Sequence, residues 1–264
     1  MTLRQGRAVR AGSAVAMGRA IVRWLAASTM ATVLAAIGLF GLAATPALAS
    51  GACTFPSGGD WFAVTCWNSS YPLMSLSEEY AVPAAPSSTG ESSFAIWGGL
   101  QDAGGDTVLQ NVLNWNGSSW SAYPEYYWAG NTSDPHNMNW TSIPVYPGDT
   151  LTSTITATSC NSEYHCTWSE TIHDVNTDGN SSSSAIGSLS VFTQLLGGVL
   201  EVRSAHGCAS LPYDGHIAFR DISVTDNQTF NHPAVTFGNS TPDYQCSMVV
   251  DSSPTSADFI WKRD

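Results

Sequence analysis

The segment Thr150-Leu151-Thr152-Ser153-Thr154-Ile155-Thr156-Ala157-Thr158 decides the fold class of this chain. β-Branched residues dominate the segment, and such residues favour the pleated backbone of a strand. It follows Pro147-Gly148-Asp149, whose residue types are typical of a tight turn. A second segment, Ser93-Phe94-Ala95-Ile96-Trp97, alternates polar and apolar residues as a half-buried strand does. Both segments therefore predict β-strands.

The same alternation of short strands and turns continues along the chain from Gly51 onward. Further strands are predicted at 107–115, 119–128, 138–146, 188–194, 198–204, 215–224, 233–238 and 256–262. Apolar residues do not recur every 3.6 positions over the length of a helix. We expect the serine-rich residues 180–185 to form a flexible loop. The pattern indicates an all-β chain folded as an antiparallel sandwich or barrel.

The first 49 of the 264 residues differ from the rest of the chain. They contain five arginines and no acidic residue, then an apolar run from Trp24 to about Leu42, and then the small-residue pattern Ala47-Leu48-Ala49. These features are typical of a secretory signal peptide, although the apolar run is also long enough for a membrane anchor. We therefore expect a signal peptide at 1–49, a loop-rich segment at 50–90 with room for one strand pair, which is also a candidate pro-segment, and a β-sandwich domain at 91–264.

The charge of the mature chain excludes two classes of partner. After residue 49, four basic residues face all 21 acidic residues, which gives a net charge of −17. Nucleic acids and anionic membranes are bound by clustered Lys and Arg, so neither is an expected partner. The same composition favours a protein that works in acid, because many of its carboxylates are protonated near pH 4 and repel one another less. We expect a secreted monomer.

All six cysteines lie after the predicted cleavage site, and an even number in an exported chain indicates disulfides. Six cysteines permit 15 pairings. The two short separations in sequence favour Cys53–Cys66 and Cys160–Cys166, which leaves Cys208–Cys246. A zinc site would need a C-x2-C pair or clustered histidines, and the sequence has neither. We therefore expect no metal and no cofactor.

Two polar residues stand out within predicted strands. Gln110 shares a strand face with Val108 and Val112, and an amide on an apolar face is costly unless it has a partner or a use. Glu201 points the same way as Val199 and Arg203, so it is either paired with Arg203 or a working group with a perturbed pKa. By this pattern alone, a structural role is the more common explanation for each.

The strings around these residues resemble those of the glutamic peptidases, or eqolisins (peptidase family G1). The matching segments follow in the family's order over about 95–224: Ala95–Leu100, Val108-Leu109-Gln110, Trp120–Trp128 with Glu125 at its centre, Pro147–Leu151, Val199-Leu200-Glu201 and Ile217–Val224. The resemblance implies an antiparallel two-sheet β-sandwich of the concanavalin A-like jelly-roll type. It also implies an acid-acting endopeptidase that cleaves polypeptides.

The resemblance assigns roles to four residues. Glu201 activates a water that attacks the scissile carbonyl and then protonates the leaving amine. Gln110 donates its amide to the developing oxyanion and holds that water. Trp97 walls the site and keeps it dry, or is simply a core aromatic. Glu125 contacts the substrate, or is a solvated strand residue.

The chain departs from the family pattern at three places. Gln101 and Ser121 occupy positions where the family has aspartate, and Asn111-Val112 follows Gln110 in place of a small polar residue and glycine. Such a chain looks like a distant branch of the family.

Other functions would use the same fold. A lectin-like module would stack sugars on some of its nine tryptophans and leave Glu201 tied to Arg203. A glycosidase, or a two-glutamate peptidase of neprosin type, would use Glu125 together with Glu201.

Overall fold

The structure, a computed structural model, describes residue 53 and residues 61–87, 93–128, 141–188, 190–204, 208–228, 233–241 and 245–262. All of them belong to one compact unit, Ala44–Asp264. The predicted signal peptide at 1–49 lies outside the described residues. No helix in the described ranges is long and apolar enough to cross a membrane.

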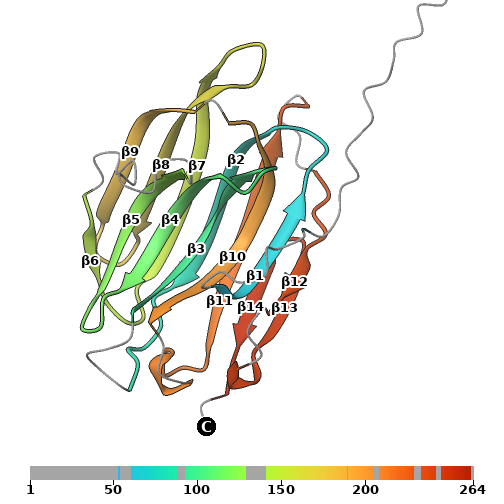
Figure 1. The fold of residues 1–264 in the computed structure, drawn as a ribbon. Helices are drawn as coiled ribbons and strands as arrows, with labels where there is room; N and C mark the ends of the chain where they lie inside the picture. The colour runs from blue at the N-terminus through green and yellow to red at the C-terminus, as the bar shows by residue number, and fades with distance from the viewer. Residues whose placement is uncertain are drawn as a thin grey trace, which may run out of the picture. The chain divides into compact units, whose positions relative to one another are not determined.

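Fourteen strands in these ranges form two antiparallel sheets, which lie face to face (Figure 1). The first sheet has the order β12 (Gly238–Ser240), β1 (Trp61–Asn68), β10 (Phe192–Ser204), β3 (Ser93–Asp102), β4 (Thr107–Trp115), β5 (Trp120–Trp128) and β6 (Ile143–Val145). The second has the order β13 (Val249–Ser253), β14 (Ser256–Ile260), β11 (His216–Asp226), β2 (Leu73–Ala81), β7 (Thr150–Cys160), β8 (Cys166–Asp174) and β9 (Gly179–Gly187). Short 3-10 turns occur at Cys208–Ser210 and Gln245–Ser247. The predicted all-β, two-sheet sandwich is confirmed.

The core between the sheets follows from alternation along each strand. In β7, Leu151, Ser153 and Ile155 are buried while the threonines between them are more exposed. Alternate side chains of a strand point to opposite faces, so each sheet directs one set of residues inward. Phe94, Ile96 and Leu100 of β3 join this core from the first sheet.

The first sheet also has a buried outer face, turned away from the second sheet. Its cluster comprises Val64, Cys66, Ala95, Trp97, Val108, Val112, Tyr123, Leu196 and Val199, with Cys53 and Trp61 packed against it. We call these residues the outer cluster. Strands β3 and β4 are therefore buried on both faces, which explains their nearly continuous apolar sequence.

The N-terminal segment contains two strands, which belong to different sheets. Within 50–90, β1 lies between β12 and β10, and β2 lies between β11 and β7. Each is an interior strand of its sheet, so release of 50–90 as a pro-segment would open both sheets. Leu76, Glu78 and Tyr80 of β2 are buried and alternate with less buried residues. This alternation is difficult to recognise in a segment that is rich in Ser, Pro and Gly.

Other strand boundaries also needed correction. Residues 180–185, predicted to be a flexible loop, belong to strand β9, which pairs with β8 from Thr167 to Asp174. The predicted strands 188–194 and 198–204 are parts of one strand, β10, whose register shifts between Leu196 and Val199. Serine fits β9 because its hydroxyl can find partners in the core: Ser183 donates to Glu170.

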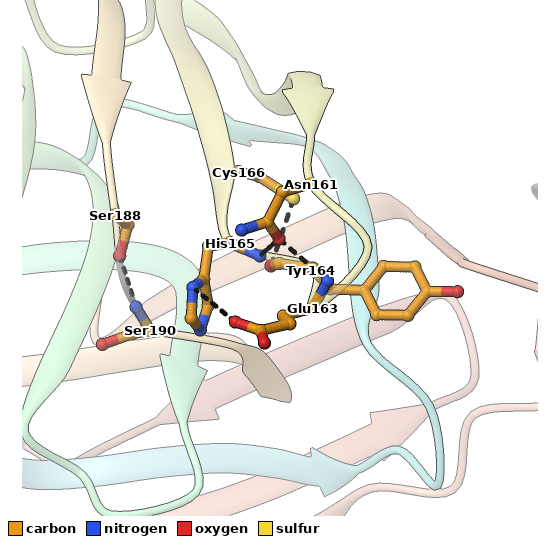
Figure 2. Close-up of polar contacts among 7 residues, drawn as sticks. All are labelled: Asn161, Glu163, Tyr164, His165, Cys166, Ser188 and Ser190. Atoms are coloured by element: carbon orange, nitrogen blue, oxygen red, sulfur yellow. Dashed lines mark hydrogen bonds and ion pairs between the residues drawn. The ribbon is translucent and has the colours of Figure 1, made fainter.

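The three disulfides are those favoured by sequence separation: Cys53–Cys66, Cys160–Cys166 and Cys208–Cys246. The first ties the chain before β1 to the outer cluster. The second closes the β7–β8 hairpin. In this hairpin the Asn161 side-chain oxygen accepts hydrogen bonds from the amides of Glu163 and His165 (Figure 2).

Candidate active site

Gln110 lies on the outer face of β4 and is 6% exposed. It pairs with Gly99 of β3 on one side and with Glu125 of β5 on the other. Its Nε2 donates a hydrogen bond to Oε2 of Glu125 at 3.1 Å. The amide that looked costly from sequence thus has a carboxylate partner in the next strand, and its second N–H is not used in this bond.

Glu201 lies on β10, opposite Trp61 of β1 and Ala95 of β3, and is partly buried. Trp97 donates from Nε1 to Oε2 of Glu201 at 3.2 Å. The Trp97 ring is 1% exposed and meets the Trp61 ring edge-on, with centroids 5.6 Å apart. Trp97 is therefore both a packed aromatic and the orienting donor for one oxygen of Glu201. The side chain of Arg203, the alternative partner considered for Glu201, lies outside the described residues.

The strand register fixes how the two pairs are related. Paired residues of neighbouring antiparallel strands share a face, and Trp97 pairs with both Val199 and Val112. Glu201 is opposite Ala95, and Gln110 is opposite Gly99. The Cα atoms of Gln110 and Glu201 are thus two strands and four residues apart, about 16 Å in a flat sheet. Trp97 stands midway between them, so the arrangement is two hydrogen-bonded pairs flanking an indole.

A feature that sequence reasoning missed lies on the inner side of the same strands. Glu78 of β2 is 3% exposed, and its carboxyl packs against Gly98 of β3, where even a β-carbon would collide with it. Burial raises the pKa of Glu78 to about 8, against smaller lowering effects from Ser153 and the Gly98 amide. Gly98 sits between Trp97 and Gly99, directly behind the outer face.

Glu170 of β8 occupies a similar place behind β4. It is fully buried and accepts a hydrogen bond from Ser183 at 3.2 Å. Burial raises its pKa well above the usual range; Ser183 and the backbone amide of Gln110 oppose this effect, while the charge of Glu125 adds to it. Both members of the Gln110–Glu125 pair therefore affect the pKa of Glu170, although they lie on the other face of the sheet.

Asn111 connects these layers. Its side-chain Nδ2 donates toward Ser153 Oγ at 2.9 Å and toward the carbonyl oxygens of Thr154 and Thr171 at 3.1 and 3.2 Å. The hydroxyl of Tyr80 donates to the Asn111 carbonyl at 3.2 Å. The departure from the family pattern after Gln110 is thus an inward-pointing amide that joins the two sheets behind the site.

The alternation of β2 and β8 contains a signal that could have identified both acids. Glu78 alternates with the buried residues Leu76 and Tyr80, and Glu170 alternates with Trp168 and Ile172. A carboxyl in such a position is buried by the same rule that buries its neighbours.

Among the described residues no group forms a metal site, and a hollow lies apart from the predicted site residues. No group of three or more His, Cys, Asp or Glu side chains in the described ranges could hold a metal ion. A hollow of about 410 Å³ lies near Val82, Pro147, Asp214 and His216. None of the predicted site residues lines it. His165 Nδ1 lies 3.7 Å from Glu163 Oε2. This pair, drawn in Figure 2, belongs to the β7–β8 hairpin and not to the strands that carry Gln110 and Glu201.

Comparisons with known proteins bear on the fold. No protein-family model and no curated protein matches the sequence. Among the similar solved structures are three that each align over 77% of this chain and 98% of the other. They are scytalido-glutamic peptidase with a peptide-based transition state analog (18% identity, TM-score 0.52), the same peptidase with a transition state analog inhibitor (19%, 0.53), and SCP-B, a member of the eqolisin family, with the tripeptide Ala-Ile-His (18%, 0.50). The predicted resemblance to the glutamic peptidases is confirmed at the level of the fold.

Proposed function

We propose that this protein is a secreted, acid-acting endopeptidase of the glutamic type, in which Gln110 and Glu201 act on a peptide bond. The observation that carries the proposal is that an amide and a carboxylate lie on one face of one sheet, each oriented by a partner: Glu125 for Gln110 and Trp97 for Glu201. The similar structures hold peptide-based ligands in the same fold, which supports a polypeptide substrate.

The chemistry assigned to Glu201 is general base and then general acid catalysis. Trp97 engages Oε2 and so orients the carboxylate that is proposed to take a proton from the attacking water. The water oxygen bonds to the carbonyl carbon. When the C–N bond breaks, Glu201 returns the proton to the leaving nitrogen. The hydrogen bond from Trp97 favours one orientation of the carboxylate and so reduces the reorganisation that the reaction requires.

Gln110 is proposed to stabilise the oxyanion. One hydrogen of Nε2 goes to Glu125, and the second can be donated to the carbonyl oxygen as it gains charge. The two groups need not touch. Two hydrogen bonds of about 2.9 Å, a C=O bond of about 1.2 Å and an approach of about 3 Å together span about 10 Å. A carbonyl lying over Trp97 is proposed to link the two pairs.

Two variants test the proposal. The purified mature protein should digest denatured protein at about pH 3–4 in the presence of a pepstatin-type inhibitor of aspartic peptidases. Glu201→Gln and Gln110→Ala should each abolish this activity while keeping the wild-type unfolding midpoint, and Glu163→Gln on the exposed β7–β8 hairpin is the matched control. Full activity in either site variant would overturn the assignment.

A carbohydrate-binding function is favoured by one observation, the exposure of Trp128 and Tyr127 at the end of β5, at 42% and 41%. Six of the other described tryptophans, including Trp97, are buried, so the described part of the chain offers little ring surface for stacking. A glycosidase or neprosin-type mechanism is less well supported, because Glu125 is one strand farther from Glu201 than Gln110 is. Binding to a glycan array that is lost in Trp128→Ala would support the carbohydrate function instead.

A further inference from the structure

We propose that Glu78 and Glu170 are positioning residues that hold the floor of the candidate site in place only while both carboxyls are protonated. The inference deepens the proposed peptidase function and rests on it for the identity of the site. The floor consists of Trp97, Gly99 and Gln110 on the outer faces of β3 and β4. The two acids come from the opposite sheet and reach the backbone of these strands from behind.

Glu78 supports β3. Its carboxyl fills the space left by the missing side chain of Gly98, between the Trp97 and Gly99 positions. Ser153 and the Gly98 amide lie close enough to lower the Glu78 pKa slightly, but neither Glu78 oxygen has a described partner with hydrogen-bond geometry. A neutral carboxyl tolerates such a place far better than a carboxylate, which would lack both water and a counter-charge.

Glu170 supports β4. It lies by the backbone amide of Gln110, and the charge of Glu125 reaches it through the sheet. Repulsion acts equally on both partners, so an ionised Glu170 would push on the carboxylate that orients Gln110. Protonation of Glu170 thus protects the Gln110–Glu125 hydrogen bond.

Among the described residues, the groups that face the two acids provide no positive charge. Around Glu78 these are Tyr80 on its own strand, Ser153 of β7 and the Gly98 amide of β3, while Phe219 and Ile222 of the neighbouring β11 are apolar. Around Glu170 they are Ser183 of β9, Gln110 of β4, Glu125 of β5 and the apolar Ile155 of β7. The ion pairs of His165, His173 and Arg220 are made with Glu163, Asp178 and Asp258 instead.

The direction of the effect follows from proton linkage. Both acids bind their proton more tightly in the folded protein than in the unfolded chain. The stabilisation is complete below the unfolded pKa of 4.5 and is lost as pH rises toward the folded value, about 8 for Glu78. The floor is therefore firm in acid and loosens as these groups ionise.

The first experiment titrates the seven glutamates of the full mature chain by carboxyl-carbon NMR. Two signals should titrate well above 4.5, one should vanish in Glu78→Gln and the other in Glu170→Gln. If every glutamate titrates near its usual pKa, the proposal is wrong. This measurement also decides the case on the wild type if a variant does not fold.

The second experiment measures the unfolding midpoint from pH 4.5 to 8.5. Each Gln variant mimics the neutral acid. The unfolding midpoint of the wild type should fall as pH rises, and it should fall less steeply in each variant, because each substitution removes the linkage of about one proton. Glu79→Gln is the control, because Glu79 is on the same strand but faces the other way, opposite Arg220 in the strand register. Wild-type slopes in both Glu78→Gln and Glu170→Gln would overturn the proposal.

The third measurement separates positioning from mere stability. If the protein is an active peptidase, the alkaline limb of its pH–activity profile should move to higher pH in both Glu78→Gln and Glu170→Gln. If the limb stays at the wild-type pH in both variants, the two acids only stabilise the fold and the inference is overturned. If neither the wild type nor the variants show peptidase activity, the proposed function fails, but the positioning role can still be tested. The side-chain amide NMR signals of Gln110 should then shift with pH in the wild type and not in Glu170→Gln, and a shift that persists in the variant contradicts it.

Discussion

The outer and inner faces of β3 and β4 hold their polar groups in opposite ways. On the outer face, Gln110 and Glu201 each have a hydrogen-bond partner, and Glu201 keeps partial access to solvent. On the inner face, both oxygens of Glu78 and one of Glu170 lack a described partner with hydrogen-bond geometry. The comparison shows that a glutamate's role in this fold depends on the face it occupies. A partnered carboxylate suits proton transfer, whereas a buried one is stable only as the neutral acid.

The largest expected effect concerns the inner face. Between pH 4.5 and 8 the wild type should lose up to about 5 kcal/mol of unfolding free energy through Glu78, because its folded pKa of about 8 lies some 3.5 above the usual 4.5. Urea unfolding at pH 4.5, 6.5 and 8.5 measures this loss. Stability that rises over this range would contradict the burial of a neutral Glu78.

The second prediction contrasts two adjacent residues on opposite faces. Asn111→Ala should cost about 3 kcal/mol of stability, because it leaves Ser153 and the Thr154 and Thr171 carbonyls without their donor. Gln110→Ala should cost much less stability. Denaturant titration of both variants decides between them. Equal losses would mean that the two faces do not differ in this way.

The third prediction tests the close packing between Glu78 and β3. Gly98→Ala should destabilise the protein by about 2 kcal/mol, because the added methyl enters the space of the Glu78 carboxyl. Gly148→Ala is the comparison variant, since nothing lies within 4 Å there and the cost of about 1 kcal/mol comes from its φ of +91°. The double variant Gly98→Ala/Glu78→Ala should recover part of the loss, and no recovery would argue against the contact.

The smallest expected effect concerns the outer face. Trp97→Phe keeps an aromatic ring but removes the Nε1 donor to Glu201. Peptidase activity should fall about tenfold, equivalent to about 1.4 kcal/mol, with kcat more affected than KM. Trp61→Phe serves as the control within the same ring pair. An unchanged kcat in Trp97→Phe would remove the orienting role of the indole.

Much of the fold was predictable from local sequence. Strand β4 has the predicted bounds 107–115, and the turn at Pro147–Asp149 closes with a hydrogen bond from the Asp149 amide to the Tyr146 carbonyl. Strand β9 was not predictable in the same way, because consecutive serines carry no apolar alternation. Its strand character comes from pairing with β8 and from partners such as Glu170.

The residues of the candidate site were likewise predictable from local sequence, whereas their contacts were not. Alternation and the family-like strings identified Gln110, Glu201, Trp97 and Glu125, because the period of a strand assigns each side chain to a face. The partners of these residues come from pairing between strands distant in the chain, and pairing depends on register, which local sequence does not state. The neutral state of Glu78 and Glu170 depends on a third level, the packing of one sheet on the other, because only that packing removes water from their carboxyls. Sequence by itself determined which residues face together; tertiary structure decided which of them touch and which carry charge.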